Sequence, residues 1–243
     1  MKRAKIADIF FSTQGEGIYA GEPQLFVRFY DCMWNCRFCD TSLNAYEKYT
    51  PIELYNQIKR FTPLEKAGEG IGKSSLAGFT QEYHSLCLTG GEPLLYKDFL
   101  KQFLRLVKYD GKTTYLETNG ILAEALAELI DDIDIVAMDL KLPSSTGMRD
   151  YWKEHSKFLK VALRRNLFIK MVICLDTSRD DVDQAIRLIT RAKASNIPVV
   201  LQPNFFELSK DLLARTREIE KYCSRQLKHV EVIPQLHKIT RIK

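Results

Sequence analysis

The chain alternates short apolar runs with longer stretches of helical periodicity, and this alternation constrains the fold more than any other feature. Apolar runs rich in β-branched residues are typical of parallel strands that helices cover on both faces. Such runs lie at 25–30, 85–89, 113–117, 135–140, 167–174 and 198–202. Amphipathic helices are expected at 51–61, 99–109, 123–130, 151–163, 180–194 and 208–226.

Six consecutive strand–helix units predict an α/β fold, namely a partial (β/α)6 barrel of TIM type with flanking strands. The flanking strands are expected at 6–11 and 229–234. An open doubly wound sheet is the alternative, but no Gly-x-Gly-x-x-Gly follows the first strand to mark a dinucleotide site. In both architectures, ligands bind at the carboxyl ends of the strands.

The 243 residues are expected to form a single domain, 1–243, with a glycine-rich loop insertion at 62–82. No apolar run approaches the roughly 20 residues that span a bilayer. The basic residues at 2–5 are not followed by an apolar signal segment, so we expect a cytoplasmic protein without a membrane partner. A net charge of +5, scattered among acidic residues, predicts a solvated surface and no nucleic-acid partner.

Three of the six cysteines, Cys32, Cys36 and Cys39, directly follow the first of these strands. Three thiolates at this spacing can hold a [4Fe-4S] cluster and leave its fourth iron open. An open iron can bind the amino and carboxylate groups of S-adenosylmethionine (SAM), whose reductive cleavage gives a 5′-deoxyadenosyl radical. A zinc site is the alternative, but zinc prefers four ligands, and no second cysteine pair or histidine pair is present. The spacing indicates radical SAM chemistry without specifying the reaction.

Polar residues recur where the other strands end. The motifs are Thr89-Gly90-Gly91-Glu92-Pro93, Glu117-Thr118-Asn119-Gly120, Asp139-Leu140-Lys141 and Gln202-Pro203-Asn204. The paired glycines let the backbone approach a ligand, and Glu92 is expected to accept a hydrogen bond from the methionyl ammonium of SAM. Each motif alone is also compatible with a turn or a helix cap, but their recurrence favours a ligand-lined mouth. Lys170 is weaker evidence for a ligand site, because a lysine in mid-strand is also compatible with an ordinary ion pair or a sheet edge.

With these motifs, the chain resembles the 7-carboxy-7-deazaguanine synthase family of 7-deazapurine biosynthesis, from residue 9 to about residue 238. The most distinctive parts are Gln14-Gly15-Glu16-Gly17, Phe26-Val27-Arg28 and Cys39-Asp40-Thr41. The resemblance implies ring contraction of 6-carboxy-5,6,7,8-tetrahydropterin to 7-carboxy-7-deazaguanine, with loss of ammonia and regeneration of SAM. One departure is Asp31, where the family usually has glycine, and it changes the backbone freedom beside the first cysteine.

The resemblance also implies roles for individual residues, although no catalytic acid or base is assigned. The implied substrate-binding residues are Thr13, Gln14, Gly15, Glu16, Arg28 and Thr89. The implied SAM-binding residues are Phe38, Cys39, Asp40, Gly91, Glu92, Asp139, Leu140, Lys141, Gln202, Pro203, Asn204 and Phe205. Arg28 would face the substrate carboxylate, and Thr41 would donate its hydroxyl oxygen to Mg²⁺, which keeps several waters when it has few protein ligands. From the residues alone, Arg28 is also compatible with a core salt bridge, and Thr41 with a helix cap.

A homodimer, and a flavodoxin or ferredoxin as electron donor, are further implications of the resemblance. Three other functions share parts of the pattern: a glycyl-radical-enzyme activase, an iron–sulfur redox or binding protein without radical chemistry, and an RNA-modifying radical enzyme. The segment 14–17 and Thr41 argue against the activase. The polar strand ends argue against a simple redox protein.

Overall fold

The computed structural model describes residues 2–41, 44–61 and 83–240, so the predicted insertion at 62–82 lies outside the described residues. The strands are β1 (Ala4–Thr13), β2 (Pro23–Phe29), β3 (Glu47–Tyr49), β4 (Ser85–Gly90), β5 (Thr114–Thr118), β6 (Ile135–Asp139), β7 (Asn166–Ile173), β8 (Val199–Pro203) and β9 (Val230–Val232). The α-helices are α1 (Pro51–Lys59), α2 (Lys97–Tyr109), α3 (Ala123–Leu129), α4 (Pro143–Thr146), α5 (Trp152–Ala162), α6 (Arg179–Arg191), α7 (Lys210–Cys223) and α8 (Leu236–Thr240).

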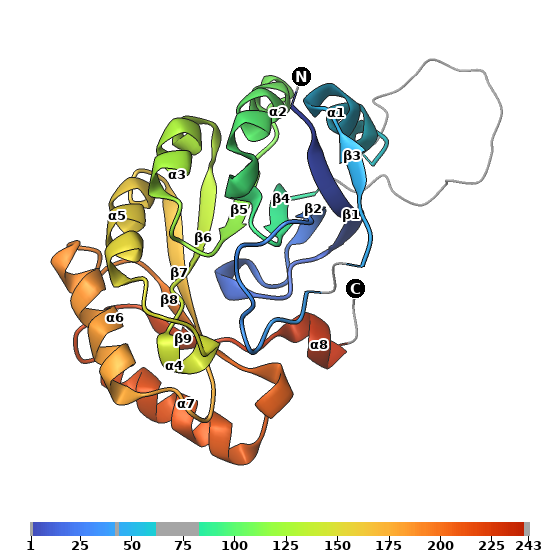
Figure 1. Ribbon diagram of the computed structural model, residues 1–243. Helices are drawn as coiled ribbons and strands as arrows, with labels where there is room; N and C mark the ends of the chain where they lie inside the picture. Colours follow the sequence, from blue (N-terminus) through green and yellow to red (C-terminus); the bar gives the residue numbers. More distant parts are fainter. Residues whose placement is uncertain (1, 42–43, 62–82, 241–243) are drawn as a thin grey trace.

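The strands form one sheet in the order β3-β1-β2-β4-β5-β6-β7-β8-β9. From β2 onward every neighbouring pair is parallel, whereas β1 runs antiparallel to both β2 and β3. Figure 1 shows α1, α2, α3, α5, α6 and α7 as an arc outside the strands. The predicted α/β fold with a partial barrel is confirmed, and the predicted strands and helices agree with the observed ones to within three residues at each end.

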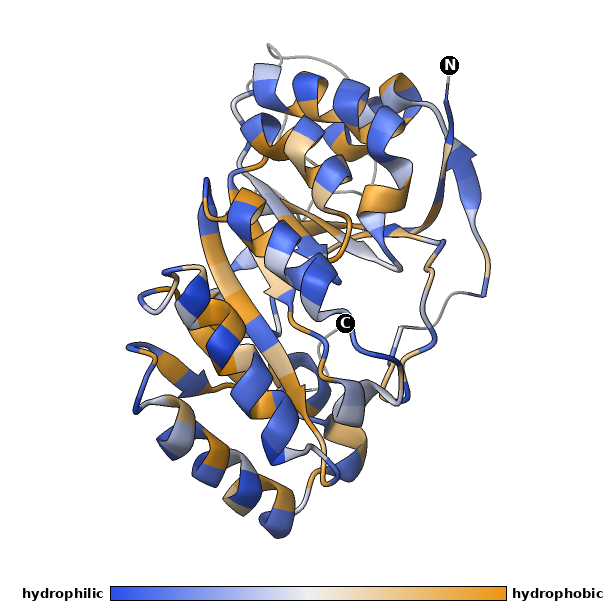
Figure 2. Ribbon diagram, turned by 60° about the vertical axis from the view of Figure 1, so that its left-hand side comes forward, coloured by the Kyte–Doolittle hydropathy of each residue, from blue (hydrophilic) through white to orange (hydrophobic). Residues whose placement is uncertain are grey.

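The main core lies between the sheet and this arc of helices. Helix α2 shows how the sequence builds it, because Phe99, Leu100, Phe103, Leu104 and Val107 share one buried face. Burial of each Phe or Leu side chain stabilises the fold by about 1.5–3 kcal/mol. Figure 2 shows the helices striped with hydrophilic and hydrophobic residues, as expected for helices with one face in a core. None of the helices in the described ranges has the length and apolarity needed to cross a membrane.

The inner face of the sheet changes from apolar to polar along each strand. A small second core on this face contains Phe26, Cys87, Tyr115, Ala137, Phe168 and Val200. Side chains in a strand alternate between faces, so the residue two positions later lies on the same face. Those residues are Arg28, Thr89, Glu117, Asp139, Lys170 and Gln202. All six are polar, and the carboxyl ends of the strands therefore carry a polar layer above an apolar floor.

The loop between β1 and β2 folds across this inner face. It is closed by backbone hydrogen bonds from Gln14 N–H to Glu22 O and from Gly21 N–H to Gln14 O, both 2.8 Å long. Gly17 has a φ of +69°, and a Cβ atom there would lie 2.5 Å from the Phe168 ring. A side chain at residue 17 would therefore be both strained and obstructed. The loop in this way brings the 14–17 segment to the polar layer.

Candidate active site

Two adjoining cavities open at the carboxyl ends of the parallel strands. The larger has a volume of about 320 Å³ and is lined by the cysteine loop and the ends of the strands from β4 to β8. The smaller has a volume of about 100 Å³ and is lined by the β1–β2 loop and by β2. They share the residues Glu16, Asp40, Thr41, Thr89 and Glu117. A ligand in one cavity would therefore lie next to a ligand in the other.

The three cysteines of the predicted cluster motif all line the larger cavity. Cys32 Sγ accepts a hydrogen bond from the backbone N–H of Trp34 at 3.5 Å, and Cys39 N–H donates to Cys36 O at 3.0 Å. All three are free thiols. Burial raises the pKa of Cys32 and of Cys36, so iron would displace protons from them when it binds. Three soft sulfur ligands on one short loop suit an iron–sulfur cluster.

Arg37 anchors the cysteine loop to the opposite side of the mouth. Its guanidinium forms an ion pair with Asp176 at 2.9 Å and donates to the carbonyl oxygen of Ser144 at 2.8 Å. Its backbone N–H donates to Thr146 O at 3.1 Å. Ser144 and Thr146 belong to α4, a single turn that the periodicity of the sequence did not predict. The loop that follows β2 is therefore held by the chain that follows β6 and β7.

The backbone at Asp31 does not need the conformational freedom of a glycine. Its carboxylate accepts hydrogen bonds from Lys5 Nζ at 3.0 Å and from Tyr96 Oη at 2.6 Å. Its backbone oxygen accepts from the N–H of Glu92 at 2.8 Å. Its φ is not positive, because Lys193 is the one non-glycine residue with a positive φ in the described ranges. The departure from the family pattern is therefore compensated locally.

Most of the predicted SAM-binding residues line the larger cavity, namely Phe38, Cys39, Asp40, Gly91, Asp139, Lys141, Gln202 and Asn204. Two oxygen acceptors there are poorly satisfied. Gln202 Oε1 is buried without a hydrogen-bond partner, and Asp139 Oδ1 has an ion pair with Lys170 at 3.3 Å but no aligned hydrogen bond. Buried acceptors of this kind are normally satisfied, so a ligand with hydroxyl or ammonium donors fits this wall.

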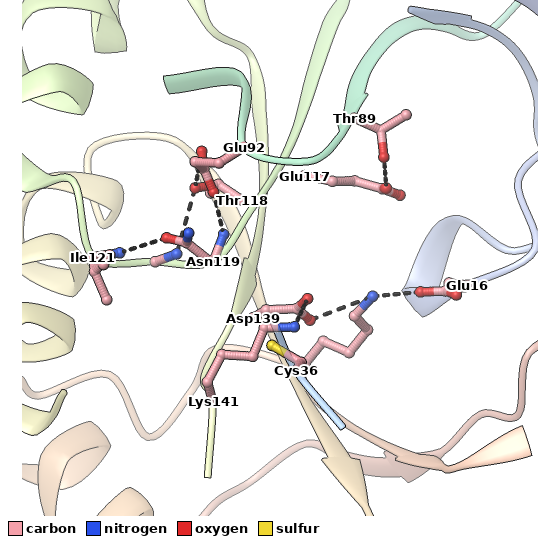
Figure 3. Close-up of polar contacts among 12 residues, drawn as sticks. Glu16, Cys36, Thr89, Glu92, Glu117, Thr118, Asn119, Ile121, Asp139 and Lys141 are labelled. Atoms are coloured by element: carbon pink, nitrogen blue, oxygen red, sulfur yellow. Dashed lines mark hydrogen bonds and ion pairs between the residues drawn. The ribbon is translucent and has the colours of Figure 1, made fainter. Parts of the chain in front are cut away.

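Four predicted SAM-binding residues do not line the cavity: Glu92, Leu140, Pro203 and Phe205. The carboxylate of Glu92 is fully buried. Oε1 accepts from Leu94 N–H at 3.1 Å and Thr118 Oγ1 at 2.9 Å, and Oε2 accepts from Asn119 N–H at 2.8 Å (Figure 3). Burial raises the pKa of Glu92 to about 7 despite these donors. In this structure Glu92 joins the ends of β4 and β5.

All six predicted substrate-binding residues, Thr13, Gln14, Gly15, Glu16, Arg28 and Thr89, line the smaller cavity. The guanidinium of Arg28 lies 5.1 Å from the centre of the Phe10 ring. Its Nε is a buried donor without a hydrogen-bond partner. An anionic ligand in this cavity would satisfy that donor.

Comparison with known proteins places the chain in a family. A family model for the radical SAM superfamily matches residues 26–207. The 7-carboxy-7-deazaguanine synthase of Geobacter sulfurreducens is 33% identical, over 97% of this chain and 96% of that protein. The chain belongs to the 7-carboxy-7-deazaguanine synthase family. The resemblance seen in the sequence is thereby confirmed, and the activase alternative is not favoured.

One further relative and one solved structure extend the comparison. The 7-carboxy-7-deazaguanine synthase of Archaeoglobus fulgidus is 31% identical, over 99% of this chain and 100% of that protein. The crystal structure of QueE from Escherichia coli covers 97% of this chain and 95% of its own, with a TM-score of 0.63. At 19% sequence identity, the QueE comparison shows a shared fold.

At the mouth of this synthase-family member, two residues make contacts for which the sequence had given no individual role. Glu117 accepts hydrogen bonds from Thr89 Oγ1 at 2.5 Å and from Gln14 Nε2 at 3.0 Å. Burial raises the pKa of the Glu117 carboxyl. Lys170 lines the larger cavity. Both residues lie two positions after an apolar inner-face residue, so alternation along the strand is the sequence signal that places both on the ligand side of the sheet.

The segment that follows β9 reaches the same mouth. Leu236 N–H donates to Gly15 O at 2.8 Å, and Gln235 Nε2 donates to Glu16 Oε1 at 2.7 Å and to Asp40 Oδ2 at 3.2 Å. His237 packs against Gly15. No local pattern could have revealed these contacts, because they depend on where β9 places the chain.

Glu16, Asp40 and His237 bring their potential metal-ligand atoms within 4.8 Å of one another. Protein cations already compensate this group: Lys170 pairs with Glu16, and Lys238 pairs with Asp40 at 3.1 Å. Burial alone would raise the pKa of Asp40, but His237 and Lys238 hold it well below its usual value. Thr41 lies beside this group, where it lines both cavities.

Proposed function

We propose that the protein catalyses the radical ring contraction of 6-carboxy-5,6,7,8-tetrahydropterin to 7-carboxy-7-deazaguanine, with release of ammonia, in queuosine-type 7-deazapurine biosynthesis. Membership of the synthase family supports this reaction. The observation that carries the proposal is the pair of adjoining cavities: one has three free thiols and unsatisfied acceptors, and the other has the unsatisfied donor of Arg28. These cavities match a cationic, hydroxyl-bearing cofactor and an anionic substrate.

In this proposal Cys32, Cys36 and Cys39 hold the [4Fe-4S] cluster. The cluster supplies the electron that cleaves SAM to the 5′-deoxyadenosyl radical. Asp139 and Gln202 accept hydrogen bonds from SAM hydroxyl groups. Lys141 pairs with Asp139 at 2.7 Å and lies 5.2 Å from the centre of the Phe38 ring, so it orients an aromatic surface for the adenine.

On the substrate side, Arg28 binds the carboxylate of the pterin. Phe10 packs under the guanidinium and limits its movement. Gln14 and Glu16 provide the amide and carboxylate groups that read the polar edge of the pterin, and Thr89 adds a hydroxyl. Because Thr89 and Gln14 already donate to Glu117, the proposal gives that carboxyl a supporting role in the same wall.

The proposal extends to Mg²⁺ bound at Thr41, which borders both cavities and could be shared with substrate oxygens. Family membership also supports a homodimer, reduction by flavodoxin or ferredoxin, and cytoplasmic action. We propose further that residues 1–243 act as one catalytic domain without a nucleic-acid or membrane partner.

The test is an anaerobic assay of the reconstituted protein. It combines dithionite, SAM, Mg²⁺ and 6-carboxytetrahydropterin, and follows the products by mass spectrometry. Formation of 7-carboxy-7-deazaguanine with many turnovers per SAM molecule is the expected result. Release of 5′-deoxyadenosine without that product would reject the ring contraction and favour an activase-like enzyme. The Cys36→Ala variant is the negative control.

A further inference from the structure

Lys170 lines the larger cavity and pairs with Glu16, which lines both cavities, yet it has no part in the reaction as described above. It extends from the inner face of β7, and its side chain is only 11% exposed. Its ammonium pairs with Glu16 Oε2 and, at 3.3 Å, with Asp139 Oδ1. Figure 3 shows the side chains of Glu16 and Asp139, with dashed lines at both carboxylates.

The two carboxylates that share Lys170 belong to different walls. Glu16 comes from the β1–β2 loop and lines both cavities, whereas Asp139 ends β6 and lines only the larger one. Each has one other close donor: Gln235 Nε2 lies 2.7 Å from Glu16, and Lys141 Nζ lies 2.7 Å from Asp139. In the described part of the chain, Lys170 is the one cation that pairs with both carboxylates.

The charges around Lys170 show why both carboxylates depend on it. Glu16, Glu117 and Asp139 are buried around Lys170, with Lys141 as a further cation on the SAM side. Burial tends to raise the pKa of Glu16, but Lys170 reverses this tendency and lowers it. Without Lys170, Glu16 and Asp139 would lose their shared counter-ion, and a buried charge without a partner is strongly unfavourable. The two carboxylates would then move apart or take up protons.

We propose that Lys170 is a positioning residue that sets the distance between Glu16 on the pterin side and Asp139 on the ribose side. This inference rests on the proposed function and deepens it. It explains how the pterin carbon that carries the carboxylate is held against the 5′ carbon of SAM. Transfer of an atom between two ligands requires near-contact geometry, and a misplacement of about 1 Å can lower a rate by about 100-fold.

The predicted defect is uncoupling of SAM cleavage from product formation. In the coupled reaction, the 5′-deoxyadenosyl radical takes a hydrogen atom from the pterin carbon and 5′-deoxyadenosine later returns one, so SAM is regenerated. When the pterin is displaced, the radical takes a hydrogen atom from buffer or protein instead. Each such event consumes one SAM molecule and one electron from dithionite, and releases 5′-deoxyadenosine and methionine.

The experiment measures 5′-deoxyadenosine released per 7-carboxy-7-deazaguanine formed, by mass spectrometry, for the reconstituted wild type and the Lys170→Met variant. We expect the ratio to rise at least about tenfold in the variant, while its iron content stays close to wild type. The matched control is Lys160→Met on the outer face of α5, where the lysine is exposed. A purely structural role would lower the amount of active enzyme but leave the ratio unchanged, so an unchanged ratio overturns the proposal.

Lys170→Gln provides a second variant, because it removes the charge but keeps a polar group. If Lys170→Met does not hold its cluster, the same ratio in Lys170→Gln decides the matter. Loss of the cluster in both variants, with the control intact, assigns Lys170 to folding and overturns the proposal. A wild type that makes no 7-carboxy-7-deazaguanine overturns the proposed function before any variant is compared, and the Lys170 inference falls with it. An unchanged ratio in variants of an active wild type overturns the Lys170 inference alone.

Discussion

The ring of His155 bridges the ends of two strands by hydrogen-bonding the backbone of Lys141. Its Nε2 accepts from the Lys141 N–H at 3.3 Å, and its Nδ1 lies 2.9 Å from the carbonyl oxygen of Gly120. Because Nε2 is the acceptor, Nδ1 carries the proton and donates to Gly120. Gly120 follows β5 and Lys141 follows β6, so helix α5 fixes two of the loops around the SAM cavity from behind.

This bridge makes stability depend on pH. Burial lowers the pKa of His155 from its usual 6.5 to about 4. Below about pH 6.5 the unfolded chain therefore binds a proton that the folded protein does not bind. The free energy of unfolding should fall by about 1.4 kcal/mol per pH unit from about pH 6.5 down to about pH 4. Urea denaturation of the cluster-free protein at about pH 5 and about pH 7 measures this change.

The variant His155→Gln is the comparison for that measurement, because it does not titrate in this range. It should lose the pH-dependent part of the difference, although it also loses some stability at about pH 7. Equal pH dependence in wild type and variant would show that the ring is not held neutral in the folded protein.

Glu92 should have the opposite dependence on pH. Its pKa is raised to about 7 by burial, so between about pH 4.5 and about pH 7 the folded protein binds more protons than the unfolded chain. Its contribution is complete below about pH 4.5 and is lost as the pH rises through about 7. Glu92→Gln loses the hydrogen bond from Asn119 N–H, at a cost of about 1–3 kcal/mol at about pH 5.

The cost of the Glu92→Gln substitution should therefore shrink at about pH 8, where the wild type must ionise a buried carboxyl. Urea denaturation of both proteins at the two pH values gives the comparison. A cost that is constant with pH would mean that the Glu92 carboxyl is already ionised at about pH 5.

Asp31 should stabilise the cysteine loop through the hydrogen bonds of its carboxylate. Its bonds to Lys5 and Tyr96 are partly exposed, so we expect Asp31→Ala to lower the free energy of unfolding by about 1 kcal/mol. Asp31→Gly should cost more, about 1.5–2 kcal/mol, because it also frees the backbone of the unfolded chain. Both variants should lose iron to a chelator faster than the wild type.

The control for this prediction is Asp98→Ala, which removes an exposed ion pair with Lys2 away from the cysteine loop. It should leave the free energy of unfolding and the rate of iron loss close to those of the wild type, because an exposed ion pair contributes little. If the Asp31 variants lose iron no faster than Asp98→Ala, the hydrogen bonds of Asp31 do not stabilise the loop.

The sequence predicted the strands and helices well because each one packs a face against the core. Strand β3, helix α4 and helix α8 were missed, since three to five residues are too few to show a period. Helix α4 matters most among them, because it holds Arg37 and thereby the cysteine loop. Its position depends on contacts between segments far apart in the sequence.

The residues of the site also divide into those that the sequence predicted and those that it did not. Motifs at strand ends predicted residues of the larger cavity, because parallel strands bring their carboxyl ends to one edge. The residues of the smaller cavity were predicted from the family resemblance. The hydrogen bonds that Glu92 accepts from Thr118 and Asn119 were not predictable, since these residues approach it only when β5 pairs with β4. The ion pairs of Lys170 were not predictable either, because the sequence does not show which carboxylates surround a mid-strand lysine until the strand register is known.

Arg28 offers the sharpest test of the substrate cavity, because its Nε is a buried donor with no partner. If it binds the pterin carboxylate, Arg28→Met should raise the KM for 6-carboxytetrahydropterin by about 10- to 100-fold, equivalent to a charge-assisted interaction of about 1.5–3 kcal/mol. Arg28→Lys keeps the charge but loses the planar guanidinium, and should recover only part of the affinity. Cleavage of SAM without substrate should be nearly unchanged in both variants, because Arg28 does not line the larger cavity.

A tetrahydropterin that lacks the carboxylate separates this role from a general effect on the cavity. As a competitive inhibitor it should bind the wild type and Arg28→Met with inhibition constants within about threefold of each other, because the contact with the missing carboxylate is absent from both. If the substitution weakens this analogue as much as it weakens the substrate, Arg28 shapes the cavity instead of binding the carboxylate. The alternative of a core salt bridge predicts that second result, together with a large loss of thermal stability.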